Sequence, residues 1–232
     1  MRSKEFTNFT YDLTSSNKLY LEHFVAGVCA ISHQDAHNYI REIETDSKLA
    51  VHIQTELKNH RRGNEIDGEV FYGRRLGWYA IVRAMKPLLV VETGTEKGLG
   101  SLVIAAALLK NGVGRLITID IEPMSGFLIG GDYERVTQRI KSDSLSALSQ
   151  IDGIDLFIHD SDHRASHEAA ELRLVTSRLS ANGIVVSDNA HVTTELAKWS
   201  LQSNRQFKYF SEEPLNHWYP GGGIGASRTT QG

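Results

Sequence analysis

The first third of the chain has the spacing of amphipathic helices. Apolar side chains recur at intervals of three and four residues between residues 18 and 57, which predicts three helices with one buried face each. Ser32 or Asp35 could cap the second helix and Asp46 the third. The polar stretch 58–69 predicts a loop that ends this helical region.

From about residue 76 the pattern changes, because short apolar runs alternate with helical stretches. Strands are predicted at LLVVETG, RLITIDIEP, IDLFIHD and GIVVSDNA, with FKYFSEE and GGIGASR following near the end of the chain. A looser segment, 123–150, holds a possible helix. This alternation predicts a mostly parallel, doubly wound α/β sheet. Ligands of such sheets bind beyond the carboxyl ends of the strands.

Composition narrows the class of protein. The chain has 232 residues, of which 41% are hydrophobic and 23% charged, as expected of one large globular domain. A net charge of −3 gives no basic surface for nucleic acid or anionic membrane. The most apolar window, 101–109, is far shorter than the ~20 residues of a membrane span. The single Cys29 fits a reducing compartment, so we expect a soluble, cytoplasmic protein.

The strongest motif is VVETGTEKGLGS, which follows a predicted strand and opens a helix. Gly94 and Gly98 allow a tight turn that brings backbone N–H groups close to a ligand. Glu92 stands where the dinucleotide fingerprint has its first glycine, and its carboxylate would repel a pyrophosphate. The turn therefore suits a cationic ligand better than a nicotinamide dinucleotide. Asp120 ends the next strand, where an acid can bind ribose hydroxyls.

These motifs resemble those of class I S-adenosylmethionine-dependent methyltransferases, over roughly residues 76–227. The resemblance implies a Rossmann-like sheet of seven strands in a cofactor domain of residues 71–232, preceded by a helical extension of residues 1–70. It also implies S-adenosylmethionine as cofactor. The residues that it assigns to cofactor binding are Glu92, Gly94, Thr95, Gly98, Asp120, Asp143 and Asp160.

A second polar cluster follows two later strands, in HDSDH and SDNAH. Asp160, Asp188 and Asn189 would meet at one edge of the sheet, and their oxygens are ligands that suit Mg²⁺, Mn²⁺ or Ca²⁺. Acids at strand ends also serve as turn formers and helix caps. The pair resembles metal-dependent O-methyltransferases of the catechol and caffeoyl-coenzyme A type, and sugar O-methyltransferases of antibiotic pathways. That resemblance implies that these three residues bind the metal.

The same resemblance supplies candidates for the catalytic base. Asp162 matches the second acid of the sugar enzymes' D-x-D motif, His163 stands where the catechol-type enzymes place a lysine, and His191 is another candidate. A histidine is largely neutral at pH 7 and needs little tuning to accept a proton. The implied reaction is O-methylation of a small hydroxylated molecule in secondary metabolism: a sugar, a phenol or a polyol.

Other interpretations stay open. A nicotinamide-dependent oxidoreductase could use a similar sheet, although Glu92 counts against it, and a non-catalytic domain could keep the cofactor fold. Trp218 and Tyr219 could wall an acceptor pocket. Tyr72 or Arg74 could contact the cofactor carboxylate, or could serve packing and surface charge. The N-terminal helices could cover the site or form the surface of a homo-oligomer.

Overall fold

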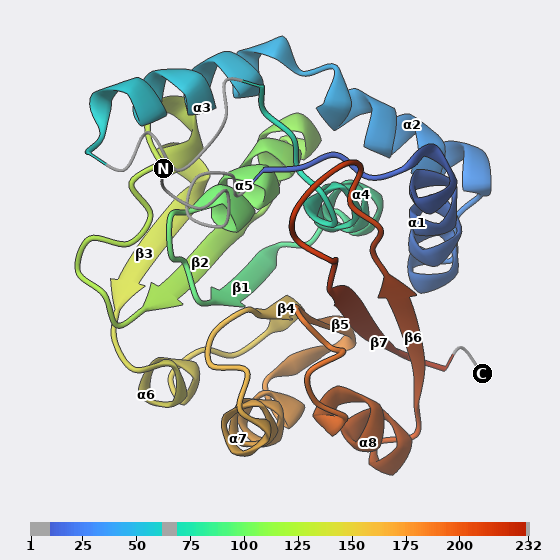
Figure 1. The fold of residues 1–232 in the computed structure, drawn as a ribbon. Helices are drawn as coiled ribbons and strands as arrows, with labels where there is room; N and C mark the ends of the chain where they lie inside the picture. The colour runs from blue at the N-terminus through green and yellow to red at the C-terminus, as the bar shows by residue number, and fades with distance from the viewer. Residues whose placement is uncertain (1–9, 62–68, 231–232) are drawn as a thin grey trace.

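The computed structural model describes residues 10–61 and 69–230, and its centre is a seven-stranded sheet of order β3-β2-β1-β4-β5-β7-β6 (Figure 1). Only β7 runs antiparallel to its neighbours. The predicted doubly wound, Rossmann-like sheet is therefore confirmed. The strands are β1 Leu89–Thr93, β2 Arg115–Asp120, β3 Thr137–Lys141, β4 Ile154–His159, β5 Leu179–Ser187, β6 Arg205–Ser211 and β7 Gly223–Thr229.

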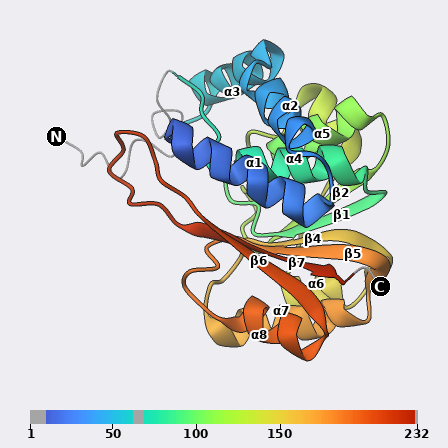
Figure 2. The same ribbon diagram turned by 90° about the vertical axis from the view of Figure 1, so that its right-hand side faces the viewer.

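Helices cover both faces of the sheet, as Figure 2 shows from the side. One face carries α1 Ser15–Cys29, α2 His33–Glu44, α3 Ser47–Asn59, α4 Arg75–Met85 and α5 Leu99–Asn111. The other face carries α6 Ser144–Leu148, α7 Ala165–Thr176 and α8 Glu195–Gln202. Across residues 10–61 and 69–230, none of the helices has the length and hydrophobicity needed to span a membrane.

The N-terminal helices share a core with the sheet domain. Tyr11, Leu13 and Leu21 belong to the same buried cluster as Trp78 of α4, so the predicted helical extension packs directly over the α4–α5 layer. Ser32, rather than Asp35, caps α2, because its Oγ accepts a hydrogen bond from the Asp35 N–H at 3.1 Å.

The borders around this extension agree only in part with the sequence pattern. Asp46 caps α3 as predicted. Helix α3 runs to Asn59, so the predicted loop begins later than residue 58. Residues 62–68 of that loop lie outside the described residues, and the division at residue 70 stays a prediction.

Strand β3 was missing from the elements that the sequence pattern indicated. Its sequence, TQRIK, lies at the edge of the sheet with most side chains partly or fully exposed. An edge strand with little buried surface has no need of an apolar run, so hydrophobicity does not reveal it. The switch in strand order falls between β1 and β4, and their carboxyl ends define the place where a ligand would bind.

Candidate functional site

The glycine turn after β1 packs against the end of β4. Gly94 has φ +91°, and a Cβ atom added there would lie 2.0 Å from the carbonyl oxygen of Asp160. Gly98 has φ +90° and precedes α5. Both conformations favour glycine. The turn therefore needs glycine at position 94 to bring β1 and the polar end of β4 together.

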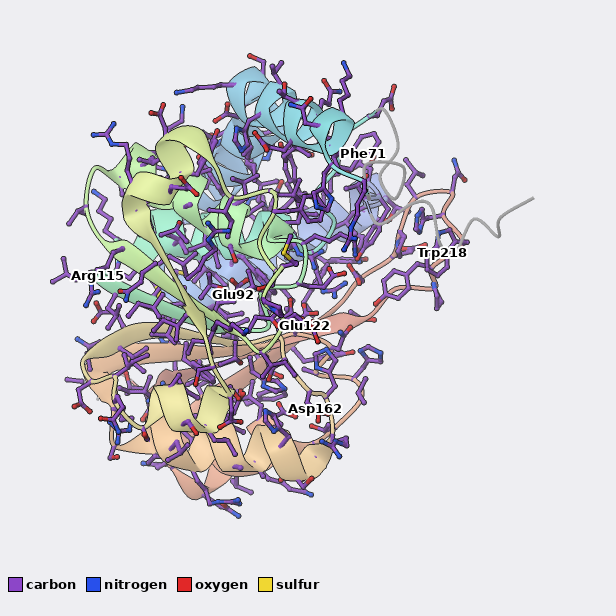
Figure 3. All side chains as sticks on the ribbon, turned by 90° about the vertical axis from the view of Figure 1, so that its left-hand side faces the viewer. Phe71, Glu92, Arg115, Glu122, Asp162 and Trp218 are labelled. Atoms are coloured by element: carbon purple, nitrogen blue, oxygen red, sulfur yellow. The ribbon has the colours of Figure 1, made fainter. Side chains whose placement is uncertain are left out.

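Glu92 lies beneath this turn and is 1% exposed. Its Oε2 accepts hydrogen bonds from Thr118 Oγ1 at 2.7 Å and from Ser101 Oγ. Burial raises the pKa of Glu92 to about 7, although these hydrogen bonds and the charge of Arg75 act in the opposite direction. Figure 3 places Glu92 in the interior. Its hydrogen bonds connect β1 to α5 and β2, and direct contact with a cofactor stays a prediction.

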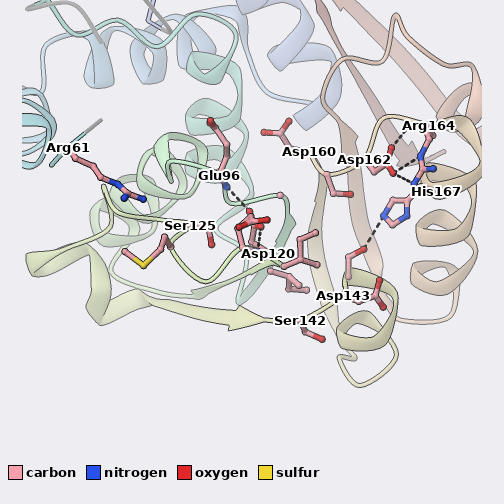
Figure 4. Close-up of a pocket in the computed structure, with 17 residues that line it drawn as sticks. Arg61, Glu96, Asp120, Ser125, Ser142, Asp143, Asp160, Asp162, Arg164 and His167 are labelled. Atoms are coloured by element: carbon pink, nitrogen blue, oxygen red, sulfur yellow. Dashed lines mark hydrogen bonds and ion pairs between the residues drawn. The ribbon is translucent and has the colours of Figure 1, made fainter. Parts of the chain in front are cut away.

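A cavity of about 750 Å³ opens at the carboxyl ends of β1, β2 and β4 (Figure 4). Of the predicted cofactor residues, Gly94, Asp120, Asp143 and Asp160 line it. The other three, Glu92, Thr95 and Gly98, are not among the described residues that line it. This cavity is large enough for a cofactor-sized ligand.

Two acids of the cavity also hold its walls in shape. Asp120 accepts hydrogen bonds from the backbone N–H groups of Glu96 and Glu122, both at 2.8 Å. Asp143 caps α6 by accepting from the Ser146 N–H at 2.8 Å, and this hydrogen bonding lowers the pKa of Asp143. Each carboxylate keeps further lone pairs that can accept from a ligand.

Acids dominate the lining of this cavity. Its basic side chains among the described residues are Arg61 and Arg164, together with His167. Such an excess of negative charge favours a ligand that carries positive charge and no phosphate. The carboxylates are those of Glu96, Asp120, Glu122, Asp143, Asp160 and Asp162.

Next to the cavity, Asp188 forms a buried ion pair with Arg74. Both Asp188 carboxylate oxygens accept from the Arg74 guanidinium, through Nε and Nη2. The same guanidinium donates through Nη1 to Glu212 Oε1 and to the Tyr11 hydroxyl, each at 2.7 Å. Although burial acts to raise it, the pKa of Asp188 is lowered by the charge of Arg74. The hydrogen bonds of the Arg74 guanidinium therefore go to Asp188, Glu212 and Tyr11, which argues against a contact with the cofactor carboxylate.

The predicted metal ligands lie together. Ligand atoms of Asp160, His163 and Asp188 all lie within 4.8 Å of one another. Burial and the charge of Asp188 raise the pKa of Asp160 well above its usual range, so a cation between the two carboxylates would relieve their repulsion. Asn189 is adjacent, with Nδ2 3.0 Å from His163 Nε2. The oxygens of Asp160, Asp188 and Asn189 suit a divalent cation, and the neutral ring of His163 lies beside them.

The candidate bases differ in their surroundings. Asp162 accepts from the Arg164 N–H at 3.0 Å and from Arg164 Nε at 2.7 Å, and this pairing lowers the pKa of Asp162 to about 2. His163 Nε2 lies 3.8 Å from Asp160 Oδ1, and burial lowers the pKa of this ring. His191 lies farther along, in the wall of a second cavity.

This second cavity, of about 360 Å³, shares Glu96 with the first. Trp218 and Tyr219 line it from the segment between β6 and β7, and their role in an acceptor pocket stays a prediction. Tyr11 adds a third aromatic ring, with centroids 5.1 Å from His217 and 5.4 Å from Tyr219. No local pattern around Tyr11 indicated this role, because it is brought to the site by the packing of the N-terminal segment on α4 and the β6–β7 segment.

Beneath the Asp160–His163 segment, a buried glutamate of α7 accepts four hydrogen bonds. Glu171 faces Thr93 Oγ1 at 2.9 Å, His159 Nδ1 at 2.7 Å, Ser161 Oγ at 2.9 Å and His167 Nε2 at 3.0 Å. Burial acts to raise the pKa of Glu171, but these partners, His159 foremost, lower it to about 2. Glu171 thus fixes the segment that carries the site. The sequence signal was an acid on the apolar face of a helix.

Comparison with known proteins agrees with the fold. Residues 91–190 match the model of a family described as methyltransferase domain. No curated protein matches this chain. The matched segment runs from the strand before the glycine turn to the segment after β5, and so contains both polar clusters.

Three solved structures share the fold at low sequence identity. The O-methyltransferase TomG from Streptomyces achromogenes, involved in tomaymycin synthesis and solved with S-adenosylmethionine, has a TM-score of 0.60 at 14% identity, over 80% of this chain and 91% of TomG. An O-methyltransferase from Bacillus cereus, in complex with S-adenosylhomocysteine, has a TM-score of 0.59 at 14% identity, over 80% and 92% of the two chains. The S-adenosylhomocysteine-bound methyltransferase PaMTH1 from Podospora anserina has a TM-score of 0.54 at 15% identity, over 80% and 88%.

Proposed function

We propose that this chain, which has the class I methyltransferase fold and a matched methyltransferase domain, transfers a methyl group from S-adenosylmethionine to a hydroxyl of a small molecule. The observation that carries the proposal is the acidic cavity at the switch point of the sheet, which adjoins a second, aromatic cavity at Glu96. The first suits a sulfonium cofactor and the second an acceptor. The confirmed resemblance to class I methyltransferases supports this assignment.

The cofactor would lie along the first cavity. Asp120 would bind the ribose hydroxyls and Asp143 the adenine amino group; in support, both line the cavity at the ends of β2 and β3. Asp160 lies where the cavity approaches the glycine turn, so the sulfonium would face the acids of β4. This position would bring the methyl group near the second cavity and supply orientation for transfer.

Asp160, Asp188 and Asn189, with His163 beside them, would hold a divalent cation such as Mg²⁺, Mn²⁺ or Ca²⁺. Such an ion, when bound, lowers the pKa of an acceptor hydroxyl and orients it. Arg74 keeps Asp188 ionised and fixed in position from the opposite side.

We assign the base to His163 because it lies beside the proposed cation ligands, whereas Asp162 is engaged by Arg164 and lines the cofactor cavity. His191, in the wall of the acceptor cavity, is the alternative base. The acceptor O–H would give its proton to His163. Its oxygen would form a bond to the methyl carbon while the bond from that carbon to sulfur breaks, which leaves S-adenosylhomocysteine. Burial keeps the His163 ring neutral and able to accept this proton.

The acceptor cavity limits the substrate. Its volume of about 360 Å³ suits a single- or double-ring molecule, and the rings of Tyr11, Tyr219 and Trp218 offer flat apolar surface to a phenol or a sugar. A place in secondary metabolism, a cytoplasmic location and an oligomer built through α1–α3 stay predictions.

Calorimetric titration with S-adenosylmethionine and with NADH, each with and without Mg²⁺, tests the proposal. We expect that S-adenosylmethionine binds and NADH does not. We also expect that S-adenosylhomocysteine forms when hydroxylated acceptors are added. An oxidoreductase would bind NADH instead, and a non-catalytic domain would bind S-adenosylmethionine without turnover. His163→Ala should abolish turnover while cofactor binding persists, and Asp152→Asn, at a 78% exposed side chain, serves as the control.

A further inference from the structure

Arg75 lies in the wall of the acceptor cavity, close to the cofactor cavity. It begins α4 and lines the second cavity, while its Nη2 lies 4.0 Å from Oδ2 of Asp160, which lines the first cavity. Its guanidinium carbon lies 5.5 Å from the centroid of the Trp78 ring. The aromatic contact holds the guanidinium in place, and its side chain is 18% exposed.

The two neighbouring arginines differ in how their donors are used. Arg74 directs all three of its nitrogens to Asp188, Glu212 and Tyr11. In contrast, Nε of Arg75 is buried and has no hydrogen-bond partner among the described residues. Its distance of 4.0 Å to Asp160 exceeds that of a hydrogen bond. A buried donor without a partner is costly, so its presence beside a cavity calls for a partner such as a bound ligand or water.

The chemistry of the missing partner follows from its surroundings. A guanidinium presents a planar fork that matches a carboxylate. Glu96 lines the same cavity and Asp160 is close by, so a single negative charge is favoured over the double charge of a phosphate monoester. We propose that Arg75 binds a carboxylate at the junction of the two cavities.

The geometry favours the amino-acid end of the cofactor as the source of this carboxylate, an assignment that rests on the proposed function. Oδ1 of Asp160 faces His163 at 3.8 Å, whereas Oδ2 faces Arg75. Arg75 and this second oxygen therefore offer a positive and a negative group 4.0 Å apart, which complements the carboxylate and ammonium of an α-amino acid. The other source is a carboxylate on the acceptor.

Titration of the wild type, Arg75→Gln and Arg75→Lys with S-adenosylhomocysteine and with 5′-methylthioadenosine separates these sources. The second compound lacks the amino-acid end. We expect Arg75→Gln to weaken S-adenosylhomocysteine binding by about 10- to 100-fold, with Arg75→Lys in between and methylthioadenosine binding unchanged. Arg115→Gln is the control, since Arg115 lies at the far end of β2, away from Trp218 (Figure 3).

A second arm compares 3,4-dihydroxybenzoate with catechol as acceptor probes at saturating S-adenosylmethionine. If the carboxylate is the acceptor's, Arg75→Gln raises the KM of the benzoate alone and leaves S-adenosylhomocysteine binding unchanged. Equal weakening of both nucleosides, or no change in any probe, overturns the proposal. Wild type that binds neither nucleoside would instead refute the proposed function, and this inference with it.

Discussion

Replacement of Arg74 by methionine should destabilise the protein strongly. The substitution keeps much of the apolar volume but removes the guanidinium that serves Asp188 and Glu212, whose side chains are both 0% exposed. Removing one partner of a buried ion pair costs about 3–5 kcal/mol, because the remaining charge stays desolvated. Two carboxylates lose their partner here, so we expect a loss within or above that range.

The effect is measurable by urea unfolding at pH 7 and by thermal melting. For a chain of 150–250 residues, each kcal/mol corresponds to about 2–4 °C in Tm, which gives a fall of roughly 6–20 °C. The destabilisation should shrink as the pH is lowered, because protonation of Asp188 in the variant removes the uncompensated charge. In the wild type the pKa of Asp188 is lowered, so the ion pair contributes stability that is lost as the pH falls through that pKa.

Two controls isolate the buried pair. The triple variant Arg74→Met, Asp188→Asn, Glu212→Gln removes all three charges and should recover most of the lost stability. Arg164→Met breaks an ion pair at a 78% exposed side chain and should leave the free energy of unfolding nearly unchanged. A loss below about 1 kcal/mol for Arg74→Met at pH 7 would refute the reasoning, because it would mean that water already solvates these carboxylates.

Three further predictions concern the acids of the site. Burial raises the pKa of Glu92 from 4.5 to about 7, so the folded state keeps this proton to a higher pH than the unfolded state does. The free energy of unfolding of the wild type should therefore fall by about 3 kcal/mol as the pH rises between these values. In urea unfolding, Glu92→Gln should remove this dependence on pH, and the same dependence in both proteins would contradict the prediction. Glu171→Gln should lower the free energy of unfolding by about 2–4 kcal/mol. It should also lower kcat, because the variant no longer holds the Asp160–His163 segment in position. A variant with the kcat of the wild type would contradict this positioning role. Asp160→Asn should abolish the heat of Mg²⁺ binding in calorimetry, and an unchanged heat would place the cation elsewhere.

Much of the fold could be predicted from the sequence because burial on both faces forces apolar runs onto the central strands. β1 and β4 are such strands, and their spacing from the helices fixed the parallel arrangement. β3 lacked this signal because it lies exposed at the edge. The capping of α6 by Asp143 likewise looks, in sequence, like any acid in a polar segment. Its placement in the cavity depends on the turn of the chain after β3.

The site was predictable where its residues sit at strand ends, and hidden where they meet from distant parts of the chain. Asp160 and Asp188 follow adjacent strands, so parallel pairing of β4 with β5 brings them together. Arg74 meets Asp188 there and also contacts Tyr11, 63 residues away in the sequence, and Glu212, 138 residues away. No spacing rule connects such positions, because their contact is a product of tertiary packing.

This hidden partner changes what Asp188 can contribute to a cation. The Arg74 guanidinium does not lose its proton and so stays charged, and it binds both oxygens of Asp188. A divalent ion would share a carboxylate whose charge is already neutralised, and it would lie near a fixed positive group. Asp160, whose pKa is raised, must then supply most of the attraction. The site should therefore bind Mg²⁺ more weakly than one with two free carboxylates, since affinity follows the charge count of the ligands.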